Sequence, residues 1–277
     1  TTNAANFLRL STVVGNAVTL AGDFSFGGDS PLWYQSYDLS LTGGMNLGGG
    51  SRTITVASPW ATGYISGQIT NGVDFNKNGA GTLVLTNSNN QWSGATNINN
   101  GILILGTYAA GIDNLVIPDG SAVTIAAGAM LDMAGRHERI GSLAGAGVVT
   151  NSHNSIGSFP NISSTLTVGG NNASTEFSGV LSGTSNLFSL VKEGSGTLTL
   201  SGAWSNYSGI TTINGGTISV STLGNGGAVS GIGAASFAAA NIVLNGGTLR
   251  YTGATTTTNR SLTIGASGAT VDASGSG

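Results

Sequence analysis

The chain contains an internal repeat, which limits its fold more than any other feature of the sequence. Residues 77–105 read KNGAGTLVLTNSNNQWSGATNINNGILIL, and residues 192–220, which begin 115 positions later (192 − 77), read KEGSGTLTLSGAWSNYSGITTINGGTISV. Twelve of the 29 positions in these two boxes are identical. Repeated units stack on their neighbours instead of folding around private cores, so the repeat predicts a stacked architecture.

The composition favours a folded, turn-rich chain. Glycine supplies 47 of 277 residues, yet 39% of the residues are hydrophobic and the net charge is −3. Disorder requires low hydrophobicity and high net charge, so disorder is not expected. Eight Lys and Arg residues spread over the whole length give no basic footprint for nucleic acid. No apolar run approaches the ~20 residues of a membrane-spanning helix, and the absence of cysteine rules out disulfides and thiolate metal sites.

Apolar residues alternate with Thr, Ser or Ala along most of the chain, which is typical of strands with one buried face. Gly-Gly, Asn-Gly and Asn-Asn pairs between these strands favour tight turns with positive φ. Short strands joined in this way fit an antiparallel sandwich or a parallel β-solenoid, and the repeat favours the solenoid, with Asn, Thr and aliphatic ladders between coils. At roughly 20–25 residues per coil and about 4.8 Å between coils, residues 1–277 would form one continuous rod about 50–65 Å long.

A second similarity places the end of the chain inside a repeat. Residues 52–56 (RTITV) match residues 260–264 (RSLTI), 208 positions later (260 − 52), so another box is expected near position 285 (77 + 208). The chain stops at Gly277 without a visible polar cap. An uncapped coil exposes unpaired backbone groups. Two alternatives follow: further chain completes the repeat, or the last coil stacks on the first coil of another molecule.

The two boxes share the pattern K-x-G-x-G-T-L-x-L, then S-G, then T-x-[IV] and a glycine turn. This pattern resembles the autotransporter-associated β-strand repeat, and segments such as 123–133 and 177–183 are similar to the gap-filling coils of the same proteins. The resemblance covers roughly residues 38–277. It implies an all-β, right-handed parallel β-helix that is secreted or displayed on a bacterial outer surface, and it offers no catalytic residue to transfer.

The charged residues are too few and too scattered to predict a catalytic site. The densest run is Arg136-His137-Glu138-Arg139, close to Asp132, but neighbouring residues of an extended segment point to opposite faces, so we expect a solvated turn. His153 is expected on a polar loop. No two of the eleven acids lie within two residues of each other, so a glycosidase pair or a calcium site would need acids from adjacent coils, such as Asp113 or Asp119 over Asp132. We therefore expect no enzyme, no metal site and no cofactor.

Aromatic residues are dense in one stretch only, residues 31–37 (PLWYQSY). On a surface these rings could stack on sugars or anchor a subunit contact; alternatively they plug the end of the solenoid or pack under a loop. The candidate contact residues in or near this stretch are Trp33, Tyr34, Tyr37 and Trp60. Three further aromatic residues fall inside the boxes and are interpreted as structural: Trp92, Trp204 and Tyr207.

These features predict a non-enzymatic, extracellular structural or adhesive β-solenoid of a bacterial surface. It would be either a segment of a long autotransporter passenger or a subunit that stacks head to tail into a filament. The partners expected are another copy of the chain, end to end, or a polysaccharide of a cell surface or matrix. The rival hypothesis is a polysaccharide-binding or polysaccharide-degrading β-helix, with residues 31–37 as platform and Asp29 or Asp38 nearby.

Overall fold

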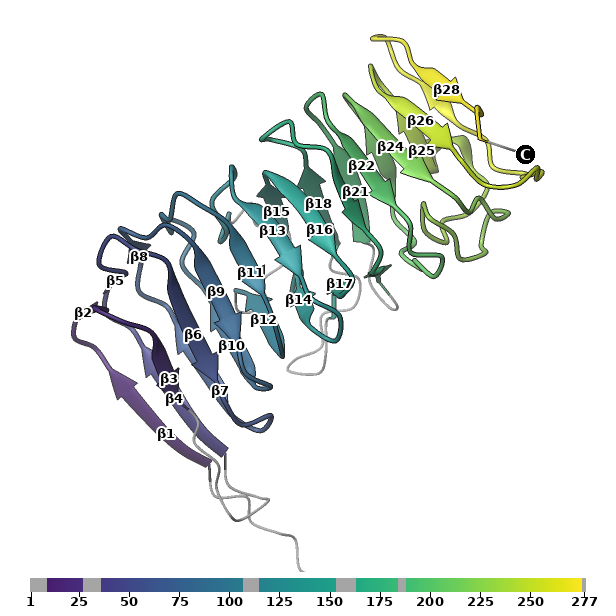
Figure 1. The fold of residues 1–277 in the computed structure, drawn as a ribbon. Helices are drawn as coiled ribbons and strands as arrows, with labels where there is room; N and C mark the ends of the chain where they lie inside the picture. The colour runs from purple at the N-terminus through teal and green to yellow at the C-terminus, as the bar shows by residue number, and fades with distance from the viewer. Residues whose placement is uncertain (1–8, 27–35, 107–114, 153–162, 184–187, 276–277) are drawn as a thin grey trace, which may run out of the picture.

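The computed structural model describes residues 9–26, 36–106, 115–152, 163–183 and 188–275. Within these ranges the chain consists of short strands and a single 3-10 turn, Ala239–Asn241. All paired strands are parallel, and they stack coil upon coil into a β-solenoid of about 10 turns (Figure 1). The expected parallel solenoid is confirmed. None of the described segments forms a helix of the length and apolar character needed to cross a membrane.

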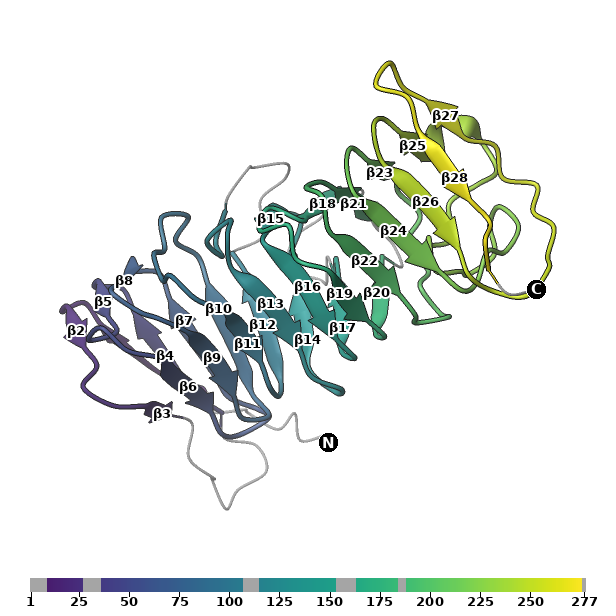
Figure 2. The ribbon, with the colours of Figure 1, turned by 45° about the horizontal axis from the view of Figure 1, so that its top comes forward.

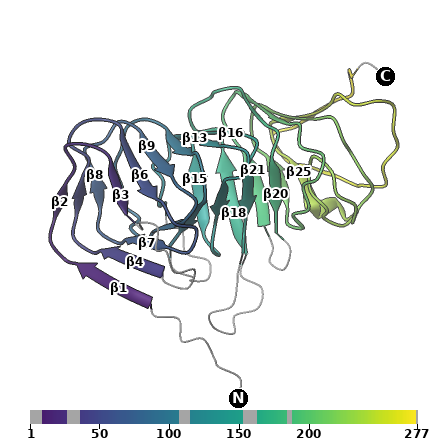
Figure 3. The same ribbon diagram turned by 60° about the horizontal axis from the view of Figure 1, so that its bottom comes forward.

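The solenoid has three sides, which Figure 3 shows for the first coils as β1–β4–β7, β2–β8 and β3–β6–β9. One side is an eight-stranded sheet made of β1 (Arg9–Val14), β4 (Ser36–Leu41), β7 (Thr62–Ile65), β10 (Thr82–Leu85), β12 (Ile102–Leu105), β14 (Met130–Asp132), β17 (Val148–Thr150) and β20 (Val180–Ser182). A second side is an eleven-stranded sheet made of β3 (Phe24–Phe26), β6 (Arg52–Val56), β9 (Phe75–Asn78), β11 (Thr96–Ile98), β13 (Ala122–Ile125), β16 (Ser142–Gly145), β19 (Thr175–Phe177), β22 (Thr197–Leu200), β24 (Thr217–Val220), β26 (Thr248–Tyr251) and β28 (Thr270–Asp272).

The third side is divided between two sheets. A three-stranded sheet near the N-terminal end holds β2 (Val18–Thr19), β5 (Met45–Asn46) and β8 (Ile69–Thr70). A six-stranded sheet further along holds β15 (His137–Ile140), β18 (Ser164–Val168), β21 (Phe188–Lys192), β23 (Thr211–Ile213), β25 (Ile242–Leu244) and β27 (Thr263–Ile264). Eleven strands on one side leave ten gaps of about 4.8 Å, so the described rod is about 48 Å long.

The core consists of aliphatic side chains stacked in columns. Ile54, Ile98 and Ile125 lie in one register column of the eleven-stranded sheet and are fully buried. Each buried aliphatic side chain stabilises the fold by about 1.5–3 kcal/mol. Outside the core, asparagine ladders join neighbouring coils, as expected: Nδ2 of Asn97 donates to Oδ1 of Asn76 at 2.8 Å, and the pair Asn99–Asn78 repeats this bond at 2.8 Å.

The two boxes occupy different pairs of sides of the solenoid and share the eleven-stranded sheet. The first box places its four strands, β9 to β12, alternately in the eleven-stranded and eight-stranded sheets. The second box places β21 to β24 alternately in the six-stranded and eleven-stranded sheets. The two similar segments 208 residues apart also lie on different sides of the solenoid. Residues 52–56 form β6 of the eleven-stranded sheet, whereas residues 260–264 lead into β27 of the six-stranded sheet. The box therefore specifies a strand, a corner and a strand, irrespective of which side it occupies.

Glycines form the corners of both boxes in the conformation that the sequence predicts. Gly101 has φ 67° and its counterpart Gly216 has φ 60°, so both occupy the left-handed region that favours glycine. A Cβ atom on Gly101 would lie 2.4 Å from the carbonyl oxygens of Gly79 and Gly81 on the preceding coil. The close approach of successive corners therefore requires glycine for a steric reason as well as a conformational one.

The last described coil leaves core positions open. Val271 pairs in register with the buried Leu249, and Ile264 pairs with the buried Leu244. Val271 is nevertheless 56% exposed and Ile264 52% exposed, because no described coil lies above them. Figure 2 shows β27 and β28 at this end of the rod.

Candidate binding surface

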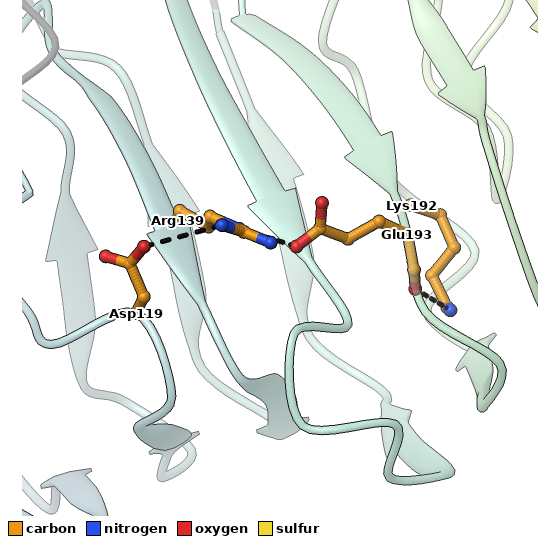
Figure 4. Close-up of polar contacts among 4 residues, drawn as sticks. All are labelled: Asp119, Arg139, Lys192 and Glu193. Atoms are coloured by element: carbon orange, nitrogen blue, oxygen red, sulfur yellow. Dashed lines mark hydrogen bonds and ion pairs between the residues drawn. The ribbon is translucent and has the colours of Figure 1, made fainter.

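A chain of charged groups crosses the outer face of the six-stranded sheet. Arg139 in β15 lies between Asp119 on the preceding coil and Glu193, which follows β21 (Figure 4). Its Nη1 lies 3.5 Å from Oδ2 of Asp119, and its Nε donates to Oε1 of Glu193 at 2.6 Å. The hydrogen bond to Glu193 raises the pKa of Arg139 above its ordinary value, so the guanidinium stays charged. Because all three groups are partly exposed, each pair contributes only about 0–1 kcal/mol to stability.

A hollow of about 490 Å³ lies beside this clamp, which we define as Asp119, Arg139 and Glu193. Its lining residues are Leu115, His137, Glu138, Arg139, Thr165 and Thr167. Strand register places His137 next to Thr165 and Arg139 next to Thr167, so four outward polar side chains form a two-by-two array. The array has spacings of about 4.8 Å across the strands and about 7 Å along them. The structure thus brings together polar groups that sequence reasoning left separate.

The expectation of a solvated turn at residues 136–139 is wrong. The segment enters strand β15, and Arg136 and Glu138 are buried at 4% and 2% exposure. The expected alternation of faces is confirmed, because His137 and Arg139 point outward. The carboxylate of Glu138 accepts hydrogen bonds from the backbone N–H groups of Val116 and Ile117, both at 3.0 Å. Burial raises the pKa of Glu138 well above its ordinary value, against the opposing effect of these two bonds.

Three further acids, Asp38, Asp74 and Asp132, also accept hydrogen bonds from the backbone. Oδ1 of Asp38 accepts from the N–H of Thr62 at 3.0 Å, and Oδ1 of Asp74 accepts from the N–H of Ala95 at 2.8 Å, each on the next coil. Oδ1 of Asp132 accepts from two backbone N–H groups, and burial raises its pKa. These carboxylates satisfy donors at the starts of strands and in turns. Among the residues that the structure describes, no cluster of three or more His, Asp or Glu could hold a metal ion.

Several candidate residues lie outside the described ranges: Trp33, Tyr34, Asp29, Asp113 and His153. Tyr37 is part of β4, with its backbone in register with Leu10, and its side chain is likewise not described. Trp60 stands in the turn between β6 and β7 and is 63% exposed. The structure therefore brings none of these residues into a described cluster.

The aromatic residues inside the boxes divide into two kinds. Trp92 and Tyr207 are buried, as expected, and occupy equivalent positions. Nε1 of Trp92 donates to the hydroxyl of Thr96 at 3.0 Å, and the hydroxyl of Tyr207 lies 2.7 Å from that of Thr211, four residues on in each case. Trp204, which was also interpreted as structural, is 72% exposed in the turn after β22 and does not pack in the core.

Sequence reasoning missed the role of lysine. The chain has two lysines, Lys77 and Lys192, and each is the first residue of a box. Both are buried, at 0% and 1% exposure, and Lys77 stands in the aliphatic column between Ile54 and Ile98. The stem packs in the core while the ammonium reaches the corner, where Nζ of Lys77 donates to the carbonyl oxygens of Asn78, Gly79 and Asn100 at 2.9, 2.8 and 3.0 Å.

Lys192 repeats this arrangement on another side of the solenoid. Its Nζ donates to the carbonyl oxygen of Glu193 at 2.5 Å, as Figure 4 shows, and to that of Gly194 at 3.4 Å. Burial lowers the pKa of both lysines, that of Lys77 to about 8. The signal in the sequence was the identical placement of the only two lysines, each two positions before the first glycine of a G-x-G corner. Each lysine therefore stabilises its corner by donating hydrogen bonds to the carbonyl oxygens there.

The comparisons with known proteins place the boxes in a family. The model of the passenger-associated-transport-repeat matches residues 75–105 and 190–220, which enclose both boxes. Both boxes therefore match this repeat family, and most of the chain is similar to an autotransporter protein. Over 248 residues, 89% of the chain, it is 39% identical to the adhesin BmaC autotransporter of Brucella suis biovar 1 (strain 1330). The chain spans 7% of the length of that relative. No solved structure matches the chain.

Proposed function

We propose that this passenger-repeat chain is a non-enzymatic segment of a long adhesive rod on a bacterial surface. The observation that carries the proposal is the similarity of 89% of the chain to 7% of an autotransporter adhesin. A stacked solenoid suits this role because each coil adds a fixed length and contacts only its neighbours. The secreted or surface location rests on the same relative.

The use of acids within the fold supports a non-enzymatic role. Glu138, Asp38, Asp74 and Asp132 accept backbone N–H bonds, and Asp119 pairs with Arg139. A general acid or base needs access to a substrate proton within hydrogen-bond reach, and carboxylates committed to the backbone do not offer it. Asp38 in particular is buried, which weakens its assignment to a polysaccharide-degrading site.

Two versions of the rod remain, and we favour the passenger segment. The much greater length of the similar adhesin supports the passenger segment. The second candidate is a filament in which copies of the chain stack end to end. A head-to-tail contact of this kind does not close on itself and produces fibres.

Adhesion is tested with beads that carry the folded chain at controlled density. Under shear, they should attach to cultured epithelial cells or to matrix-coated wells more strongly than beads that carry the heat-unfolded chain. Equal attachment of the two bead preparations would contradict the adhesive role. Sedimentation of the chain across a wide concentration range tests the filament: a concentration-dependent series of large species would support it over the passenger segment.

A further inference from the structure

The hollow beside the clamp carries hydrogen-bonding groups that the fold does not use. The hydroxyls of Thr165 and Thr167 make no hydrogen bond to another described residue, although both side chains are half-buried. Nη2 of Arg139 also donates to no described residue, because its bonds run through Nε and Nη1. Both carboxylates of the clamp remain partly exposed, at 43% for Asp119 and 25% for Glu193. Donors and acceptors therefore stand next to each other around the hollow.

The charges select among ligand classes. The clamp has one guanidinium and two carboxylates, a net charge of −1, so an anion would gain little. A cation would meet Arg139 at the centre of the clamp. An apolar ligand would bury the free hydroxyls without partners, which is costly. A neutral polyhydroxylated molecule suits all of these groups, because each hydroxyl both donates and accepts.

The size and rigidity of the hollow also fit such a ligand. About 490 Å³ lies within the range of small-molecule sites, about 300–1,000 Å³, and holds one or two sugar rings. The floor consists of paired strands β15 and β18, which fix the spacing of the groups. The clamp holds Arg139 by its Nε and Nη1, so its remaining donors are preorganised. Leu115 supplies an apolar side chain against which the face of a sugar ring can pack.

We propose that this hollow, formed by Leu115, His137, Arg139, Thr165 and Thr167, is a binding site for neutral saccharides. The inference rests on the proposed adhesive function and assigns that function a ligand class and a place on the rod. It locates recognition on the outer face of the six-stranded sheet.

The test uses the whole chain and two double variants of equal chemistry. Thr165→Val with Thr167→Val removes the two hydroxyls of the hollow and keeps the branched shape that suits a strand. Thr197→Val with Thr199→Val makes the same change on β22, in the eleven-stranded sheet, where the two threonines have the same spacing, are also half-buried and have no hydroxyl bond to described residues. The probes are an array of neutral oligosaccharides of glucose, galactose, mannose and N-acetylglucosamine, together with uronic-acid and sulfated oligosaccharides.

We expect the unaltered chain and the β22 variant to bind the same neutral oligosaccharides, and the variant of the hollow to bind them at least about 10-fold more weakly, because two hydrogen-bonding partners are lost. The site is refuted by an unaltered chain that binds no neutral probe, by salt-sensitive binding to anionic probes only, or by equal binding of all three proteins. The bead assay separates failure of this site from failure of the proposed function. If the array refutes the site but beads that carry the folded chain still adhere, only this site is refuted and the adhesive function stands.

Discussion

The buried Lys77 allows one prediction to be worked out in detail. Replacing it with methionine keeps an unbranched side chain in the aliphatic column between Ile54 and Ile98 but removes three hydrogen bonds to carbonyl oxygens. A buried carbonyl oxygen that loses its donor costs about 1–3 kcal/mol. Since Asn100 is exposed and water can reach this corner, we expect Lys77→Met to lower the free energy of unfolding by about 2–4 kcal/mol.

Lys77 also makes the free energy of unfolding depend on pH, and the direction of this dependence follows from its pKa. Burial lowers the pKa of Lys77 from 10.5 to about 8, so between these values the unfolded chain holds a proton that the folded chain has released. The contribution of Lys77 to the free energy of unfolding is therefore lowest below pH 8. It rises by at most about 3 kcal/mol as the pH approaches 10.5. The difference in unfolding free energy between the unaltered chain and Lys77→Met should widen across this window.

Urea denaturation followed by circular dichroism, repeated from pH 7 to pH 10.5, measures both effects. Lys192→Met is the matched comparison, and we expect it to cost less, because Nζ of Lys192 makes one short and one long bond to carbonyl oxygens. If Lys77→Met is as stable as the unaltered chain at pH 7 and the difference between them does not change with pH, the assigned role of the lysine is wrong.

Further predictions concern the corners, the inward acid, the buried tyrosine and the accessibility of amines. In urea denaturation, Gly101→Ala should lower the free energy of unfolding by more than about 2 kcal/mol. Gly120→Ala, whose Cβ would meet no atom within 4 Å, should change it by less than about 0.5 kcal/mol. Equal effects of the two substitutions would contradict the steric argument. Glu138→Ala should cost about 2–4 kcal/mol, because two buried N–H groups lose their acceptor, and an unchanged midpoint would refute this role. Tyr207→Phe should cost about 1–2 kcal/mol by leaving the hydroxyl of Thr211 without its partner, and a thermal melt that matches the unaltered chain would argue against that bond. An amine-acetylating reagent should modify neither lysine in the folded chain and both in urea, as mass spectrometry of peptides would show; rapid modification of Lys77 under native conditions would contradict its burial.

The fold could be predicted from the sequence because its determinants are local and repeated. Alternating strands and glycine corners recur with regular spacing, and the asparagine ladders follow from stacking. The side of the solenoid that each box occupies could not be predicted, since the strand–corner–strand unit fits any side. Coils of unequal length, such as the excursion between β24 and β25, shift the repeat relative to the turn.

The polar sites were harder to predict because they depend on contacts between coils. Glu138 reads as a surface acid in the sequence, yet its partners, Val116 and Ile117, lie 22 and 21 residues away. Arg260 donates to five carbonyl oxygens of the preceding excursion, and nothing in its local sequence shows this; the acceptors are Gly224, Asn225, Ala228, Gly233 and Ala235. Trp204 lies inside a box but is exposed, because the box fixes only the buried positions of its strands.

The mass and shape of the native protein test the central claim most directly. Mass spectrometry of the denatured chain gives its length, and electron microscopy of undenatured material gives its assembly. From the length of the similar adhesin, we predict a chain far heavier than the 27.3 kDa of residues 1–277, seen as single rods. A native chain close to 27.3 kDa, joined into long thin fibres, would contradict the passenger segment and show that a second copy covers Ile264 and Val271.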